Sequence, residues 1–135
     1  MPPEKSRAKT SVEDRLLGSI DLIDAAQACA LLRIDADDPD ATMQSMVRDG
    51  AIITLAQNGK AVFPRFQIDM ANGRIFPVVG AILKLRPACL SNLMLCYWLT
   101  RAHVDFGCAP AQRFGHDDAA IVAAFRRYVE RVRHG

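Results

Sequence analysis

The residues best able to do chemistry lie in the back half of the chain, in two groups that combine histidine with aspartate. His103 and Asp105 are two positions apart, and His116 is followed by Asp117 and Asp118. An imidazole beside a carboxylate can transfer protons or help to hold a metal ion. However, no nucleophile and no third ligand at a metal-site spacing accompanies either group. We therefore interpret these residues as polar loop positions and helix caps.

The other reactive side chains are four cysteines, which form no C-x-x-C pair and no metal-ligand spacing with the histidines: Cys29, Cys89, Cys96 and Cys108. Each stands among apolar residues, which is typical of reduced, mostly buried thiols in a cytoplasmic protein. Glycine-rich phosphate-binding motifs are absent, and neither Ser45 nor Ser91 stands in a nucleophile elbow. The sequence thus predicts a protein that is not an enzyme and uses neither a metal nor a cofactor.

The composition predicts a folded domain. The chain has 135 residues, of which 50% are apolar and 24% charged, enough for one ordinary domain or two small ones sharing a core. We expect no secretion signal and no membrane contact, because the apolar stretches are too short to span a bilayer. The net charge of +2 is low for a dedicated nucleic-acid binder. Residues 21–50 are acidic, with seven aspartates against two arginines.

The elements of the front half are two short helices and a hairpin. A helix over residues 25–34 is predicted after a cap at Asp21 or Asp24, and a helix over residues 40–48 after Asp38 and Pro39. We expect these side chains to point inward: Ala25, Ala26, Cys29, Leu32, Met43, Met46 and Val47. Residues 51–55 and 60–63 flank Asn58 and Gly59, a strong hairpin signal. Weaker strand character over residues 66–69 precedes a second turn at Asn72 and Gly73.

The back half is predicted to be helical. We expect helices over residues 76–85, 91–100, 111–114 and 119–132. The second of these is apolar on nearly every side and is therefore expected at the centre of the core. The fold class is thus mainly α with a small β-hairpin. The expected segments are an arm and short helix (1–20), a winged helix-turn-helix-like region (21–70) and a helical domain packed on it (71–135).

The helix over residues 40–48 is the candidate recognition helix, because two short helices and a hairpin are the layout of a helix-turn-helix with a wing. The residues then expected to face DNA are Thr42, Gln44, Ser45 and Arg48, with Lys60 from the hairpin. Asp37, Asp38 and Asp40 would repel phosphates at the end of the helix that approaches DNA. DNA binding, protein contact and a purely structural role therefore all stay open for this region.

Two phrases of the sequence resemble the Xre/MbcA/ParS-like antitoxins. Residues 98–114 resemble the pattern W-L-x-x-x-N-x-x-L-G-G-x-T-P-x-x-x-L of their toxin-binding domain, with Cys108 and Ala109 in place of a glycine and a threonine. Residues 63–69, Phe-Pro-Arg-Phe-Gln-Ile-Asp, resemble the phrase y-P-x-F-Q-F-d of some antitoxin-like proteins.

This resemblance implies a protein that binds and neutralises a RES-type toxin acting on NAD, and that binds the promoter of its own operon. The matched toxin-binding positions are Trp98, Leu99, Phe106, Gly107 and Pro110. The C-terminal segment 129–135, with Arg131 and Arg133, is the implied plug of the toxin's NAD cleft.

Two alternatives accompany the antitoxin hypothesis. The first is a winged helix-turn-helix transcriptional regulator of a plasmid, phage or chromosomal operon. The second is a dimeric scaffold in which the helix over residues 91–100 forms the subunit interface. We expect a homo-oligomer in each case.

Overall fold

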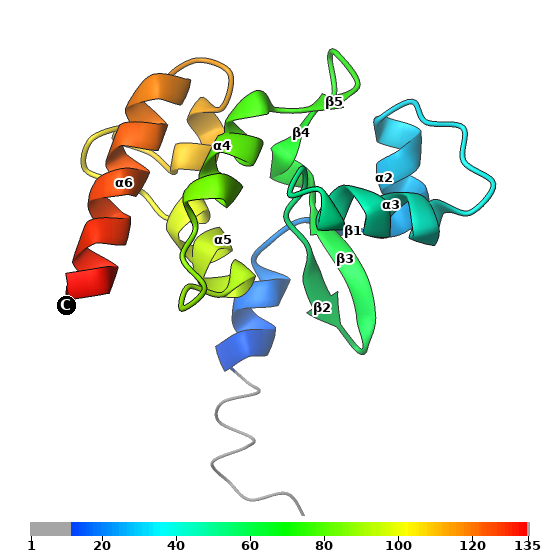
Figure 1. The fold of residues 1–135 in the computed structure, drawn as a ribbon, viewed down its shortest axis with the longest axis horizontal. Helices are drawn as coiled ribbons and strands as arrows, with labels where there is room; N and C mark the ends of the chain where they lie inside the picture. Colours follow the sequence, from blue (N-terminus) through cyan, green and yellow to red (C-terminus); the bar gives the residue numbers. More distant parts are fainter. Residues whose placement is uncertain (1–11, 135) are drawn as a thin grey trace, which may run out of the picture.

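The computed structural model describes residues 12–134 and consists mainly of helices with two small antiparallel sheets (Figure 1). The predicted mainly α class with a small β component is confirmed. Most of the predicted N-terminal arm, together with Gly135, lies outside the described residues. None of the helices in the described part has the length and apolar character needed to cross a membrane.

The front half begins with a helix over residues 12–18 and the short strand β1 (Leu22–Ile23), followed by α2 (Ala25–Leu31) and α3 (Pro39–Arg48). Asp24 caps α2, since its carboxylate accepts a hydrogen bond of 2.8 Å from the Gln27 N–H and the Gln27 side-chain oxygen accepts one of 3.0 Å from the Asp24 N–H. Asp38 caps α3, and Pro39 occupies its first turn, as predicted.

The end of α2 was predicted three residues too late. Arg33 has a φ of 59°, outside the helical region, so the helix ends at Leu31 and the chain turns away. The buried face also differs from the prediction, because Ala28 is buried whereas Ala26 is exposed.

A three-stranded antiparallel sheet has the order β1-β3-β2, formed with β2 (Leu55–Gln57) and β3 (Lys60–Pro64). Asn58 and Gly59 both have positive φ, 53° and 76°, which is the turn geometry that matches the twist of a two-residue hairpin. The turn was therefore predicted correctly. The first strand was not, because residues 51–54 are irregular.

The irregular segment is held by a buried side chain. Gln67 is fully buried, and its amide accepts from the Ile53 N–H at 2.7 Å and donates to the Ile53 carbonyl at 2.9 Å. A further bond of 3.0 Å joins the amide to the Pro64 carbonyl. The residues around it form the 3-10 turn η1 (Arg65–Gln67) rather than the predicted strand. Only β4 (Ile68–Asp69) is extended, and it pairs with β5 (Arg74–Ile75).

The back half contains α4 (Pro77–Leu85), α5 (Asn92–Thr100), the 3-10 turn η2 (Pro110–Arg113) and α6 (Asp118–His134). These helices gather on one side of the molecule, and α2 and α3 lie on the other, with the strands between them (Figure 1). The helix α5 is central, as predicted, because Leu95, Cys96 and Leu99 are fully buried. Most apolar side chains of α5 fill the core but Met94 is 45% exposed, so a role of this helix as a subunit interface stays a prediction.

Two apolar clusters form the core. The larger one combines Ile20, Ile53 and Leu55 from the front half with side chains of α4, α5 and α6. The smaller one lies under α2, α3 and β3, around Met43 and Phe63. The β4–β5 hairpin crosses the expected boundary at residue 70, so the two halves share both core and sheet residues.

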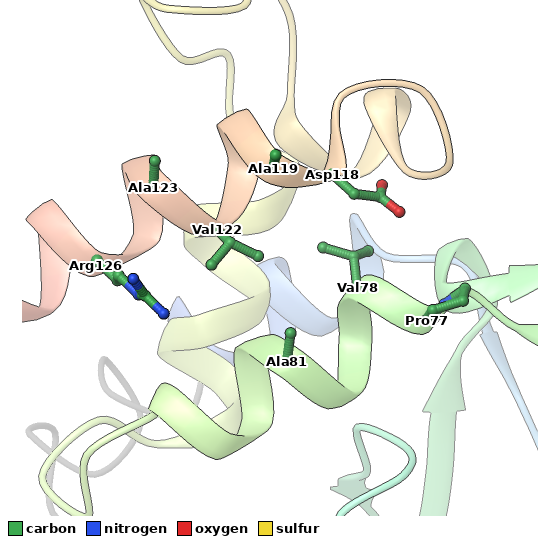
Figure 2. Close-up of a pocket in the computed structure, with 8 residues that line it drawn as sticks. All are labelled: Pro77, Val78, Ala81, Asp118, Ala119, Val122, Ala123 and Arg126. Atoms are coloured by element: carbon green, nitrogen blue, oxygen red, sulfur yellow. The ribbon is translucent and has the colours of Figure 1, made fainter.

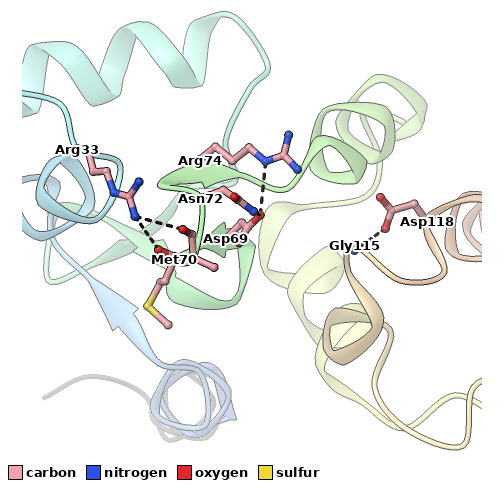
Figure 3. A network of polar contacts seen from close by, with 8 residues as sticks. Arg33, Asp69, Met70, Asn72, Arg74, Gly115 and Asp118 are labelled. Carbon is pink, nitrogen blue, oxygen red and sulfur yellow. Dashed lines mark hydrogen bonds and ion pairs between the residues drawn. The ribbon is translucent and has the colours of Figure 1, made fainter.

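Polar contacts also join the two halves at the β4–β5 turn (Figure 3). The Arg33 guanidinium donates to the carbonyls of Met70 and Ala71, at 3.5 and 3.2 Å. The Asp69 carboxylate accepts from the Asn72 amide at 2.7 Å and faces Arg74 at 3.4 Å. The loop after α2 is thereby fixed to the segment that leads into α4.

Candidate functional site

The histidine and aspartate groups are engaged in structural contacts. The His103 ring packs against Trp98 and Phe106, and its Nδ1 accepts a hydrogen bond of 3.1 Å from the Asp105 backbone. The Asp105 carboxylate lies 2.8 Å from the Arg127 guanidinium of α6. The His103 Nδ1 and the Asp105 carboxylate are 3.8 Å apart, and these contacts together hold the loop between α5 and η2.

The second group is similar. Asp117 accepts a hydrogen bond of 2.6 Å from Arg113, and Asp118 accepts one of 2.7 Å from the Gly115 backbone. Within residues 12–134, no group of three or more histidine, cysteine or acidic side chains is arranged to hold a metal ion. Of the four cysteines, Cys29 and Cys96 are buried, Cys108 is half-buried and Cys89 is exposed, so the prediction of mostly buried thiols is wrong for Cys89. Burial raises the pKa of the Cys96 thiol to about 12, and burial with the nearby Asp40 raises that of Cys29.

The candidate DNA-binding residues gather only in part. A hollow of about 320 Å³ lies between α3 and the β2–β3 hairpin, and its rim includes Asp40, Gln44 and Arg48 of α3 together with Thr54 and Ala61. Lys60 is exposed but does not line the hollow, because it precedes Ala61 in β3 and successive residues of a strand face opposite sides. Ser45 is exposed but does not line this hollow, and Thr42 is half-buried.

The electrostatics of this face are mixed. Among the described residues, neither Arg48 nor Lys60 takes part in an ion pair, so both charges are available to a partner. Arg65, the other basic residue of the hairpin region, faces Asp21 at 3.5 Å. Asp40 places a negative charge on the same rim as Arg48. The face therefore offers few free cations for a polyanion.

The candidate toxin-binding residues separate into buried supports and exposed contacts. Leu99 is fully buried, and Trp98 is 9% exposed, stacked on Tyr128 and edge-on to Phe125. Pro110 is also buried, where it begins η2. These three positions can act on a partner only indirectly, by fixing the loop that follows α5.

That loop is a closed turn. His103 and Cys108 form a short antiparallel bridge, and the Gly107 N–H donates to the His103 carbonyl at 2.9 Å. Gly107 has a φ of 68°, a conformation that side chains resist, which explains the glycine at this point of the phrase. Phe106 is half-buried against the core, and Gly107 is exposed on the rim of a shallow hollow.

The tip of the loop between α5 and η2 carries a strongly exposed apolar side chain, Val104. Val104 is 93% exposed, and its neighbour Asp105 pairs with Arg127. Arg131 is one turn further along α6 and therefore lies on the same side of the helix as Arg127. We call the set Val104, Phe106, Arg127 and Arg131 the loop-tip face.

The structure does not bring every expected residue to this face. Arg133 lies on another side of α6, where it lines a hollow with Lys84, Arg126 and Glu130. The sequence interpretation missed Val104 and Arg127. The signal for Val104 was available, because it is an apolar residue between two polar ones in a segment predicted to be a loop.

No family model, curated protein or solved structure matches this chain. We therefore infer the function of the protein from its residues and their arrangement.

Proposed function

We propose that this chain is an antitoxin-like protein that binds a RES-type toxin and neutralises it by occluding the toxin's active site. The observation that carries the proposal is the loop-tip face, in which the exposed Val104 precedes Asp105, whose carboxylate ties the loop to Arg127 of α6. The resemblance of residues 98–114 and 63–69 to Xre/MbcA/ParS-like antitoxins supports the same reading. The proposed protein acts in the cytoplasm, without catalysis and without a cofactor.

The support comes from the physics of protein interfaces. A valine whose side chain is 93% exposed gains free energy when a partner covers it, by about 1.5–3 kcal/mol for full burial. Arginine is enriched at the centres of such interfaces. The Asp105–Arg127 pair and the stacking of Trp98 on Tyr128 order the loop before binding, so little entropy is lost on association.

The test is co-expression with the product of the adjacent reading frame, which the proposal expects to be a RES-type toxin. We expect wild-type chain to restore growth, and Val104→Asp to fail because a carboxylate would be buried in the interface. Val12→Asp places the same charge at another exposed valine, on the helix over residues 12–18, and as the matched control it should still restore growth. Absence of rescue by folded wild-type protein would overturn the proposal.

A second candidate function is DNA binding by a winged helix-turn-helix, either as autoregulation or as the main activity. The order helix, β1, α2, α3, β2, β3 favours it, as do the exposed cations Arg48 on α3 and Lys60 at the start of β3. The acidic rim opposes it.

A mobility-shift titration on the DNA upstream of the coding region tests this candidate. If it binds, the affinity should fall steeply with salt, and Arg48→Ala or Lys60→Ala should each lower the salt slope by about one. Asp40→Asn should strengthen binding by removing a repulsive charge. Lys84→Ala removes a positive charge on α4, away from α3 and the hairpin, and is the control that should leave DNA binding unchanged. No shift at low salt would exclude the second function.

A further inference from the structure

A groove runs between α4 and α6 on the outside of the helical half (Figure 2). Its volume is about 550 Å³, and its lining is mostly small and apolar: Pro77, Val78, Ala81, Asp118, Ala119, Val122, Ala123 and Arg126. Val78 and Val122 point toward each other across it. Nothing in residues 12–134 covers this groove, whereas another side of α6 packs against the core through Ile121, Phe125 and Val129.

The exposed edge of the groove suits close approach of another helix. Ala119 and Ala123 are both exposed and one turn apart on α6. Side chains that end at Cβ let a second helix come near, because the distance between packed helices depends on the side chains at the contact. Val122 lies between them and supplies apolar area.

The two charges at the groove identify the helix that fits. Asp118 and Arg126 are eight residues apart on α6, about 12 Å along its axis, and Val122 is midway between them. In the described part of the chain, Arg126 takes part in no ion pair, and Asp118 uses only Oδ1, toward the Gly115 backbone. A two-fold axis at Val122 would set Arg126 of one copy against Asp118 of the other, twice.

We infer that this groove is the interface of a two-fold symmetric dimer, in which α6 packs antiparallel to α6 of a second copy. The charge pattern is complementary to itself, as an isologous contact requires. The inference does not depend on the proposed function. Because α3 lies on the opposite side of the molecule from α6, such a dimer leaves the α3 face of each copy exposed (Figure 1).

The test is the solution mass of the purified chain, measured by light scattering or sedimentation over a range of concentrations. Wild-type protein should have twice the mass of one chain. Arg126→Asp sets two carboxylates against each other at both ends of the interface, and should raise the dimer dissociation constant at least tenfold. Arg131→Asp makes the same charge change on another side of α6 and should leave the dimer intact. A monomeric wild type, or a dimer unaffected by Arg126→Asp, would overturn the inference.

A mixing experiment identifies the register. Asp118→Lys alone should also be monomeric, since it sets two cations together. Mixed with Arg126→Asp, it should form a heterodimer with opposite charges at both ends. Should Asp118→Lys lose its fold, as circular dichroism would report, Ala123→Glu replaces it as a second disrupting variant at the centre of the groove. If the wild-type chain were a monomer and Arg126→Asp abolished its binding to the toxin, the groove would instead be a binding site for the toxin. That result would contradict the inference.

Discussion

Gln67 is the residue on which the centre of the molecule depends most clearly. Its side-chain amide makes three hydrogen bonds to backbone groups of Ile53 and Pro64, in a position with no solvent exposure. It thereby replaces the strand neighbour that the irregular segment 51–54 lacks. The glutamine of the segment 63–69 is thus explained by its bonds within the chain, without a binding partner.

Replacing Gln67 by leucine should be severely destabilising. The change leaves the Ile53 N–H and carbonyl buried without partners, and each unpaired buried group costs about 1–3 kcal/mol. We expect the free energy of unfolding in urea to fall by at least about 2 kcal/mol. Gln57→Leu, at the exposed end of β2, is the control and should change stability by less than about 0.5 kcal/mol. Equal effects of the two variants would contradict this role of Gln67.

The ionisation of Asp69 should make the stability of the fold depend on pH. The hydrogen bond from the Asn72 side chain, assisted by Arg74, lowers the pKa of the Asp69 carboxyl below its ordinary value. Because the pKa is lowered in the folded state, the ionised carboxylate stabilises the fold above about pH 4, which is the ordinary aspartate pKa in the unfolded chain. This contribution to stability is lost as the pH falls through the folded-state pKa.

Unfolding measured between pH 2 and pH 7 tests this. The Asp69→Asn variant should lose part of the acid-dependent decrease in stability, and Asn72→Ala should move the Asp69 pKa back toward its ordinary value. An unchanged pH profile in both variants would show that the carboxyl is not held as described.

At the scale of elements, the turn after α2 and the β4–β5 turn depend on each other. Gly73 has a φ of 63°, and a Cβ on it would lie 2.7 Å from the Arg33 side chain that bonds to Met70 and Ala71. Both the conformation and the contact therefore require glycine at this position.

Two glycine-to-alanine changes separate these effects. Gly73→Ala should lower the free energy of unfolding by more than about 1 kcal/mol, through strain and displacement of Arg33. Gly80→Ala lies inside α4, where an added Cβ meets nothing within 4 Å, and should raise stability by about 0.5–1 kcal/mol. Thermal unfolding of the two variants side by side decides it. A stabilised Gly73→Ala protein would be incompatible with this packing.

Local signals predicted the elements well where one residue decides the conformation. Asp38 with Pro39 gave the start of α3, Asn58 with Gly59 gave the hairpin turn, and the apolar run of α5 gave its central position. The errors fall where tertiary contacts decide. A strand of two residues such as β1 exists only because β3 lies beside it, and residues 51–54 are irregular because Gln67 bonds to them.

At the scale of the whole molecule, sequence could name site residues but not their exposure. Trp98, Leu99 and Pro110 belong to a recognisable phrase, yet they are buried supports of the loop. Val104, which the phrase does not specify, is the exposed tip. Arg131 and Arg133 are neighbours in sequence but point to different sides of α6, because helical geometry separates residues two apart.

We propose that this molecule acts by docking onto a toxin through the loop-tip face. NAD turnover by the purified product of the adjacent reading frame, which the proposal expects to be a RES-type toxin, tests this when it is titrated with the chain. We expect inhibition to be complete near an equimolar ratio of wild-type chain to toxin. The Val104→Asp variant should need at least a tenfold higher concentration for the same inhibition, which corresponds to about 1.4 kcal/mol of binding free energy. Undiminished turnover in the presence of excess folded wild-type chain would contradict it.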